Sequence, residues 1–409
     1  MKKYWFYIEH YVHLNCIHHK KVLLYNTLNE HILVYNNSKI YSFIELLNSS
    51  PNNGILKVEL KSLEEKNIDI YRFILDVRKE FMGDLLPISE SNRPPVLFRS
   101  RPMVLKEGRI YQDRGENILY NLTKLSFYIN GICNFNCSEC SSYYKQFQCC
   151  HKGSEKELSV NVIADCIKNA QESSLLTVNI LGGNIFDYSH FQVLVETLNS
   201  YPFKKVYKAN IKHALKESLL RYILRNPNNC LELICTDITD LEKIYLTYNK
   251  CQSKNISFNI IIQSLNEQTC VEEIFKENLP SINLIPFYNG RNLVFFEENV
   301  FMEEDDLRNI SLNDVEIKRN SILNNHFFGH LICMNDGNIY SSLNENSLGN
   351  IREDTLEAIM YKELIKDDCW LQVRSSVEPC NNCLYSHLCP PISDYEKVLK
   401  RNNLCHVKI

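Results

Sequence analysis

Apolar runs alternate with amphipathic stretches between residues 120 and 290, and this alternation predicts the main fold. Six runs are apolar nearly throughout, at 124–131, 175–183, 204–210, 230–237, 256–263 and 281–289. Between them, apolar residues recur at helical spacing at 157–174, 189–201, 214–226, 240–252 and 268–278. Strands that are apolar on both faces are typical of a parallel sheet covered by helices. The pattern therefore predicts an α/β unit of six βα repeats, built either as an open, partial (βα)6 barrel or as a doubly wound sheet.

Shorter patterned regions lie on both sides of this unit. The N-terminal region has β-rich runs at 21–26 and 31–36, then helical stretches at 39–50 and 67–86, and ends in a Pro-rich link. The C-terminal region contains a predicted hairpin around Gly337 and a predicted helix at 355–368. The sequence thus predicts four parts: a small α+β domain at 1–95, a linker at 96–119, the βα unit at 120–309 and a further domain at 310–409.

Charge and hydropathy exclude several classes of partner. The formal net charge is -4 and the isoelectric point is near 6.3, so the chain has no basic field to attract nucleic acid or an anionic membrane. Glu9, His10 and His13 interrupt the N-terminal apolar stretch, which therefore fails as a signal peptide. No apolar run reaches the roughly 18 residues of a membrane-spanning helix. We expect a cytoplasmic protein.

Seventeen cysteines in a cytoplasmic chain indicate metal or redox chemistry where their spacing is regular. Cys133, Cys137 and Cys140 form a C-x3-C-x2-C group directly after the first predicted strand, where parallel α/β folds place their active sites. Three such thiolates can bind three irons of a cubane cluster and leave the fourth iron open. A zinc site would need a fourth donor. Cys149, Cys150 or His151 could supply that fourth donor.

The C-x3-C-x2-C group after the first strand of six βα repeats resembles the radical SAM superfamily. The resemblance implies a 4Fe-4S cluster on these cysteines, with S-adenosylmethionine (SAM) on the open iron as the source of a 5'-deoxyadenosyl radical. The glycine pair Gly182 and Gly183 at the end of the second strand is similar to the family's pair that approaches the methionine end of SAM. The resemblance therefore assigns Gly182, Gly183 and Asn184 to the cofactor site.

Two positions depart from the family pattern. Asn184 follows the glycine pair where the family has Glu, so the position can accept a hydrogen bond but supplies no charge. Glu139 precedes the third cysteine where the family tends to have an aromatic residue. Both changes weaken the expected SAM binding and leave cluster binding intact.

A second cysteine group closes the chain. Cys380, Cys383, Cys389 and Cys405 give a C-x2-C-x5-C spacing with a distant fourth cysteine, which resembles the SPASM domain of peptide-modifying radical SAM enzymes. The resemblance implies one auxiliary 4Fe-4S cluster on these four. The ligands of a second auxiliary cluster are missing together, since Ser342 and Ser393 occupy two of the expected positions. A structural zinc on the same four thiols is the alternative, and Cys333 and Cys369 are expected to be packing residues.

The N-terminal region is similar to the winged-helix elements that hold the leader of a ribosomally made peptide, because an exposed strand edge beside a helix can add a peptide strand. Along the whole chain, the resemblance is to the pseudo-radical-SAM/SPASM family associated with GG-leader peptides. The matching segments are YYKQFQCC at 143–150, NILGGNIFDY at 179–188, EFMGDLL at 80–86 and CPPISDYE at 389–396.

Three functions follow as expectations. The first, which we favour, is an iron-sulfur enzyme that modifies a precursor peptide through a 5'-deoxyadenosyl radical. The second is a catalytically degenerate scaffold that keeps its clusters, has lost SAM use through Asn184 and Glu139, and presents the peptide to a partner maturation enzyme. The third is a zinc-stapled α/β protein. No catalytic acid or base is assigned.

Overall fold

The computed structural model describes residues 2–17, 20–49, 51–90, 93–97, 117–213, 217–251, 254–275, 282–366 and 368–408. Its largest element is a sheet with strand order β12-β11-β10-β9-β8-β7-β13-β14-β15. Strands β7 to β12 pair in parallel in chain order, with bounds Lys124–Tyr128, Thr177–Leu181, Lys204–Asn210, Asn229–Cys235, Ile256–Ile262 and Ile282–Pro286. The predicted α/β class with a large, mostly parallel sheet is confirmed. Closure of the sheet into a partial barrel stays a prediction.

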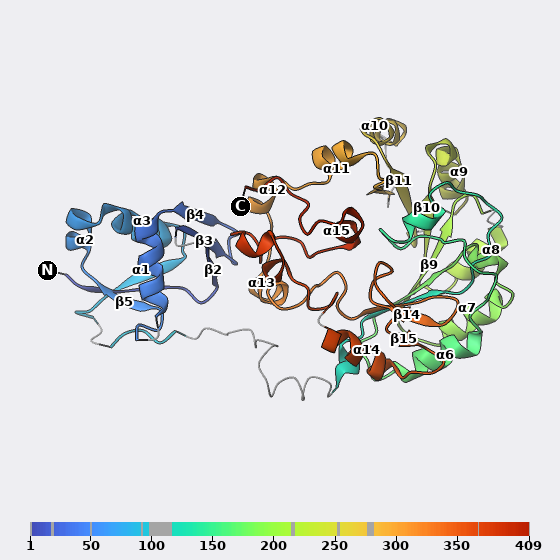
Figure 1. Ribbon diagram of the computed structural model, residues 1–409, viewed down its shortest axis with the longest axis horizontal. Helices are drawn as coiled ribbons and strands as arrows, with labels where there is room; N and C mark the ends of the chain where they lie inside the picture. Colours follow the sequence, from blue (N-terminus) through green and yellow to red (C-terminus); the bar gives the residue numbers. More distant parts are fainter. Residues whose placement is uncertain are drawn as a thin grey trace.

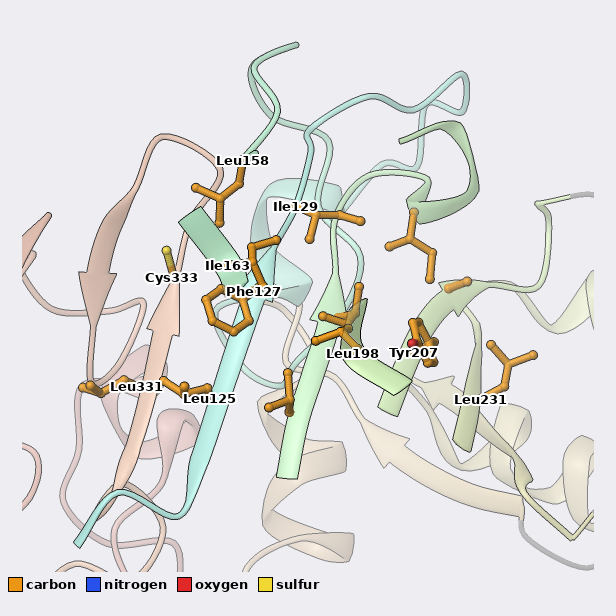
Figure 2. Close-up of a cluster of buried hydrophobic side chains, with 14 of the residues drawn as sticks. Leu125, Phe127, Ile129, Leu158, Ile163, Leu198, Tyr207, Leu231, Leu331 and Cys333 are labelled. Carbon is orange, nitrogen blue, oxygen red and sulfur yellow. The ribbon is translucent and has the colours of Figure 1, made fainter. Parts of the chain in front are cut away.

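Helices cover one face of this sheet. They are α6 (Val160–Asn169), α7 (Phe191–Asn199), α8 (Glu217–Leu224), α9 (Leu241–Cys251) and α10 (Leu265–Ile274), and Figure 1 shows α6 to α9 along one side of the sheet. Because side chains alternate along a strand, Leu125 and Phe127 of β7 belong to the core with Ile163 and Leu198 of the helices (Figure 2). Ser126 and Tyr128 therefore point to the opposite face, which we call the inner face.

The C-terminal region continues the same sheet. Strand β13 (His330–Cys333) pairs in parallel with β7, and β14 (Asn338–Tyr340) and β15 (Gly349–Asn350) follow in antiparallel order. The predicted hairpin is confirmed, and Gly337 has the positive φ of 94° that its turn requires. The sheet thus extends past the predicted boundary at 309/310. The remaining helices are α11 (Leu293–Asn299), α12 (Glu304–Arg308), α13 (Asp314–Asn320), α14 (Leu356–Lys366) and α15 (Asp394–Leu399).

The N-terminal region forms two three-stranded antiparallel sheets, with strand orders β5-β1-β6 and β2-β3-β4. The strands are β1 (Tyr4–Ile8), β2 (Val12–Ile17), β3 (Lys21–Asn26), β4 (Ile32–Asn36), β5 (Ile55–Val58) and β6 (Gly83–Pro87). Its helices are α1 (Ser38–Asn48), α2 (Leu60–Lys66) and α3 (Ile68–Lys79). The predicted linker at 96–119 falls largely outside the described residues.

One predicted helix was too long at its C-terminal end. The stretch 67–86 ends as a helix at Lys79 because Phe81 adopts a positive φ of 56°. Gly83 then begins β6, which pairs with β1. A Cβ at Gly83 would lie 2.3 Å from the Tyr7 carbonyl oxygen, so only glycine lets the two strands approach here.

The sheet β2-β3-β4 has partners on both faces. One face packs under α1 and α3, as Val22 and Leu24 share a core with Ile44 and Phe73. The other face carries Leu23 and Tyr25 and packs against the C-terminal region, where its neighbours include Leu384, Tyr385 and Leu388. None of the helices in the described part of the chain is long and apolar enough to cross a membrane.

Candidate cysteine sites and the adjoining cavity

The loop after β7 carries the first cysteine group at the carboxyl edge of the sheet. Cys133 and Cys137 lie in the loop, and Cys140 begins the short helix α5 (Cys140–Tyr143). All three are partly exposed. Burial raises the pKa of Cys133 and of Cys140, and the nearby Cys137 thiol adds to both shifts. The loop therefore holds the three thiols close enough to influence one another.

Chain segments also contact these thiols directly. The Lys152 backbone N–H donates to the Cys140 Sγ at 3.2 Å, and the Cys133 Sγ lies 3.6 Å from the His213 Nε2. His213, which sequence reasoning missed, comes just after β9, and burial lowers its pKa to about 4. Its ring is therefore neutral near pH 7.

Within the described ranges, no group of three or more His, Cys, Asp or Glu side chains is arranged around a single metal ion. In a cubane cluster each thiolate binds a different iron, so the sulfurs lie further apart than they do around one ion. Thiolate donors are also the ligands that iron-sulfur clusters use. The ligand assignment of the first cysteine group stays a prediction.

The glycine pair after β8 contacts the chain itself. A Cβ at Gly183 would lie 2.1 Å from the Ile132 carbonyl oxygen, and one at Gly182 would lie 2.5 Å from the Asn130 Oδ1. Asn130, which sequence reasoning also missed, accepts from the Gly183 N–H at 3.1 Å and donates to the Asn184 carbonyl at 2.9 Å. The two glycines therefore allow the β7 and β8 loops to touch. Their role toward SAM stays a prediction.

Asn184 lines a cavity of about 670 Å³ beside the cysteine loop. Its side-chain oxygen accepts from the Phe186 N–H at 3.2 Å, and its amide donates to the Asp187 Oδ2 at 2.8 Å. The other lining residues combine aromatic, amide and charged groups: Asn134, Phe135, Phe186, Asp187, Gln192, Lys212, His213, Ser218, Leu219, Tyr222 and Arg225. The volume lies in the range of small-molecule sites, while the lining is more polar than is usual for them.

The four C-terminal cysteines come together although Cys405 is distant in sequence. The segment around Cys405 pairs with Met302, while Cys380 opens a 3-10 helix. Burial raises the pKa of Cys383 to about 11 and that of Cys389 to about 12, and the charges of the other three thiols add to the Cys389 shift. The four thiols therefore lie near one another, with Cys380 and Cys383 buried and Cys389 and Cys405 partly exposed.

A buried arginine lies beside this second group. The Arg374 guanidinium is paired with Glu396 and donates to the backbone carbonyls of Pro390, Pro391 and Asn402. Its charge opposes the rise in the Cys389 pKa. Arg374 ties together the loops that carry the cysteines, and nothing in its sequence position indicated this.

No family model matches the sequence, and the curated proteins contain no match to it. The chain is similar to the crystal structure of Streptococcus suis SuiB bound to precursor peptide SuiA, with a TM-score of 0.51, 13% identity and coverage of 98% of both chains. Structures of SuiB bound to S-adenosylmethionine and of SuiB alone have TM-scores of 0.48 and 0.47, each at 13% identity, and cover 97% and 98% of this chain and 97% and 100% of those chains. At this identity the likeness to the first structure shows a shared fold.

Proposed function

We propose that this chain is an iron-sulfur protein of the radical SAM/SPASM type that binds a ribosomally made precursor peptide during its maturation. The observation that carries the proposal is the shared fold with SuiB, whose crystal structure contains the precursor peptide SuiA. The two cysteine groups add thiolates that can bind iron-sulfur clusters. The motifs at 143–150, 179–188, 80–86 and 389–396 favour the GG-leader subtype, with the domain boundaries predicted above.

The first candidate activity is modification of the peptide. Cys133, Cys137 and Cys140 would hold a 4Fe-4S cluster, and Gly182, Gly183 and Asn184 would border the cofactor. When bound, the cluster and SAM supply a 5'-deoxyadenosyl radical that removes a hydrogen atom from the peptide. The cavity lined by Asn184 and His213 favours this candidate, because His213 also contacts Cys133, so a small cofactor bound there would lie close to the first cysteine group.

The second candidate is a scaffold that holds the peptide for a partner enzyme without cleaving SAM. The position after the glycine pair is an amide engaged with Asp187, and Glu139 places an acid next to the third cysteine. A charged ligand at this site would therefore meet a neutral amide at Asn184 in place of the family's Glu, and an added acid at Glu139. This favours loss of SAM use.

In the C-terminal region, Cys380, Cys383, Cys389 and Cys405 would hold the single auxiliary cluster. The buried Arg374 guanidinium would offset part of the negative charge of the four thiolates. A zinc ion on the same four thiols is the alternative. Metal analysis separates the two.

The N-terminal region offers a strand edge for the peptide. Among the described strands, β4 pairs only with β3. The Asn37 N–H donates to the Lys20 carbonyl, and bonded pairs recur at every second residue of an antiparallel ladder. The backbone groups of Ile32, Val34 and Asn36 therefore point away from β3. We infer that the leader adds to this edge as a strand.

The experiment that tests the proposal is anaerobic purification of the full chain, with quantification of iron, sulfide and zinc. Dithionite and SAM are then added, and 5'-deoxyadenosine is measured with and without a synthetic library of leader-type peptides ending in Gly-Gly. Nucleoside formation supports the first candidate. Iron and sulfide with peptide binding but no nucleoside support the second.

Two variants sharpen this test. Cys137→Ala should lose the iron of the first cluster and all nucleoside formation, whereas the matched control Cys270→Ala in α10 should retain both. Full activity in Cys137→Ala would refute the ligand assignment. Zinc without sulfide, or no binding by any peptide in the library, would refute the proposed function itself.

A further inference from the structure

The segment that follows the third cysteine, residues 143–150, packs on the inner face of the large sheet. Gln148 makes its central hydrogen bonds to the sheet. Its side-chain nitrogen donates to the Ser126 Oγ of β7 at 2.8 Å, and its side-chain oxygen accepts from the Asn179 Nδ2 of β8 at 2.7 Å. The same nitrogen lies 2.9 Å from the His330 Nε2 of β13. One side chain thus joins three adjacent strands.

The same segment also contacts the chain directly after β12, at the other edge of the parallel strands. The Gln146 side-chain amide, only 4% exposed, donates to the Tyr288 carbonyl at 2.8 Å and accepts from the Tyr288 N–H at 2.9 Å. The Tyr143 and Phe287 ring centroids are 4.5 Å apart. Tyr288 and Phe287 directly follow β12. Residues 143–150 are therefore anchored near both β7 and β12.

Between these anchors lie two buried thiols. Cys149 is fully buried and Cys150 is 9% exposed, and both pack with Ile234 of β10 and Ile261 of β11. The Asn210 amide at the end of β9 lies 3.9 Å from the Cys150 Sγ. With these contacts, the segment touches the region of every strand from β7 to β12.

The polar groups further along the inner face are paired with one another. Lys208 and Glu232 form an ion pair at 2.6 Å, and the Asn259 amide donates to Glu232 at 3.2 Å. The Asn283 amide in turn donates to the Asn259 Oδ1 at 3.0 Å. These groups have their hydrogen-bond partners within the sheet, so they do not depend on a bound ligand.

We propose that residues 143–150 are a built-in plug of the inner face, and that a peptide held by this chain stays outside it. The plug would have to lose the hydrogen bonds of Gln146 and Gln148 and expose Cys149 before a peptide could reach Ile234 or Ile261. The statement about the peptide rests on the proposed function. The plug itself rests only on the contacts within the chain.

Thiol labelling of the full, anaerobically purified chain tests the plug without a peptide. Iodoacetamide should alkylate Cys149 at least about 100-fold more slowly than the partly exposed Cys270, as read by mass spectrometry at early times. The variants Gln148→Ala and Gln146→Ala should each speed the labelling of Cys149 by about 10-fold, because each releases one anchor. Labelling of Cys149 in the wild-type chain as fast as that of Cys270 would overturn the proposal.

Photo-crosslinking tests where the peptide lies. Peptides of the Gly-Gly leader library, each with a benzophenone group, should label the N-terminal region and spare the buried Ile234 and Ile261. Crosslinks to these two residues in the wild-type chain would overturn the plug. If no library peptide binds while Cys149 stays protected, the plug is supported and the peptide-binding function is refuted.

Discussion

At the scale of single residues, Gly183 shows how a close backbone contact fixes a residue type. The nearest atom to a Cβ at this position would be the Ile132 carbonyl oxygen, at 2.1 Å, and backbone cannot move aside as a side chain can. We expect Gly183→Ala to lower the free energy of unfolding by about 1–3 kcal/mol. Urea denaturation followed by circular dichroism measures this change.

The matched control is Gly153→Ala. A Cβ there would first meet the His151 side chain at 3.5 Å, which is an ordinary contact. Its free energy of unfolding should stay within about 0.5 kcal/mol of the wild type. Equal effects of the two substitutions would contradict the contact between the β7 and β8 loops.

His330 is held neutral by the donors that surround it. The Ser126 Oγ accepts from Gln148 and from Asn179, so its only proton is free to go to the His330 Nε2 at 2.9 Å. That nitrogen must then be an acceptor. Burial lowers the pKa of His330 well below its usual range, and Lys124, His326 and Lys208 lower it further.

This pKa gives the stability of the protein a defined pH dependence. The unfolded chain takes up a proton on His330 below about pH 6.5, whereas the folded chain does not, so the free energy of unfolding should fall as the pH falls below that value. The contribution of one such histidine is at most about 1.4 kcal/mol per pH unit. Denaturation curves between pH 7 and pH 5 should show a smaller slope for His330→Gln. The same slope in both proteins would contradict a neutral His330.

At the scale of helices and strands, the sequence predicted those elements whose apolar residues follow a regular local pattern. The strands from β7 to β12 are apolar on the face that packs against the helices and carry both apolar and polar residues on the inner face. Their apolar runs were still long enough to predict the strands, and the helices between them kept a regular apolar spacing. Strands β1 and β2 were not predicted, because their side chains are mostly half-buried and mix polar with aromatic residues. The helix at 67–86 was overextended because a turn at Phe81 interrupts an apolar sequence.

The same holds for the candidate sites: residues that lie close together in sequence were predicted, and single residues that the fold brings together were missed. Close spacing grouped Cys133, Cys137 and Cys140, and likewise Cys380, Cys383 and Cys389, whereas the distant Cys405 was added through the resemblance to the SPASM domain. Asn130, His213 and Arg374 were missed because each acts through partners brought close only by the fold, such as Cys133 for His213 and the Asn402 carbonyl for Arg374. Single side chains of this kind carry no periodic or spacing signal.

The edge of β4 that faces away from β3 has no partner among the described strands, and it yields a test of strand addition. Val34→Pro removes an outward N–H and leaves the β3–β4 ladder intact, because proline is tolerated at the solvent side of an edge strand. A leader peptide bound as an added strand should lose at least about 10-fold in affinity, the loss of about one backbone hydrogen bond. Fluorescence anisotropy with a labelled peptide of the Gly-Gly library measures it.

Val34→Ala is the control, because it shortens the same side chain and keeps the N–H. Its affinity for the peptide should stay close to that of the wild type. Equal losses in both variants would indicate that the Val34 side chain, and not the strand edge, contacts the peptide.

At the scale of the whole molecule, Tyr25 links the N-terminal region to the C-terminal region. Its buried hydroxyl donates to the Ile310 carbonyl at 3.1 Å and accepts from the Leu312 N–H at 2.9 Å. Tyr25→Phe leaves both backbone groups without this partner. We expect the free energy of unfolding to fall by about 1–2 kcal/mol, as measured by urea denaturation.

The control for this link is Tyr11→Phe. The Tyr11 hydroxyl donates to the Phe81 carbonyl at 2.7 Å within the N-terminal region, in an exposed setting. Its loss should change the free energy of unfolding by less than about 0.5 kcal/mol. A Tyr25→Phe effect no larger than this would contradict a stabilising contact between the two regions.

The parallel pairing of β7 with β13 has a consequence for biosynthesis. Ser126 and its partner His330 are 204 positions apart, so the ribosome releases β7 long before the strand that completes its second side. At typical elongation speeds of about 5–20 residues per second, this edge waits for about 10–40 seconds. A newly made chain with an uncovered apolar strand is prone to pair with other nascent chains. Growth at a lower temperature, or co-expression of chaperones, should therefore raise the yield of native protein.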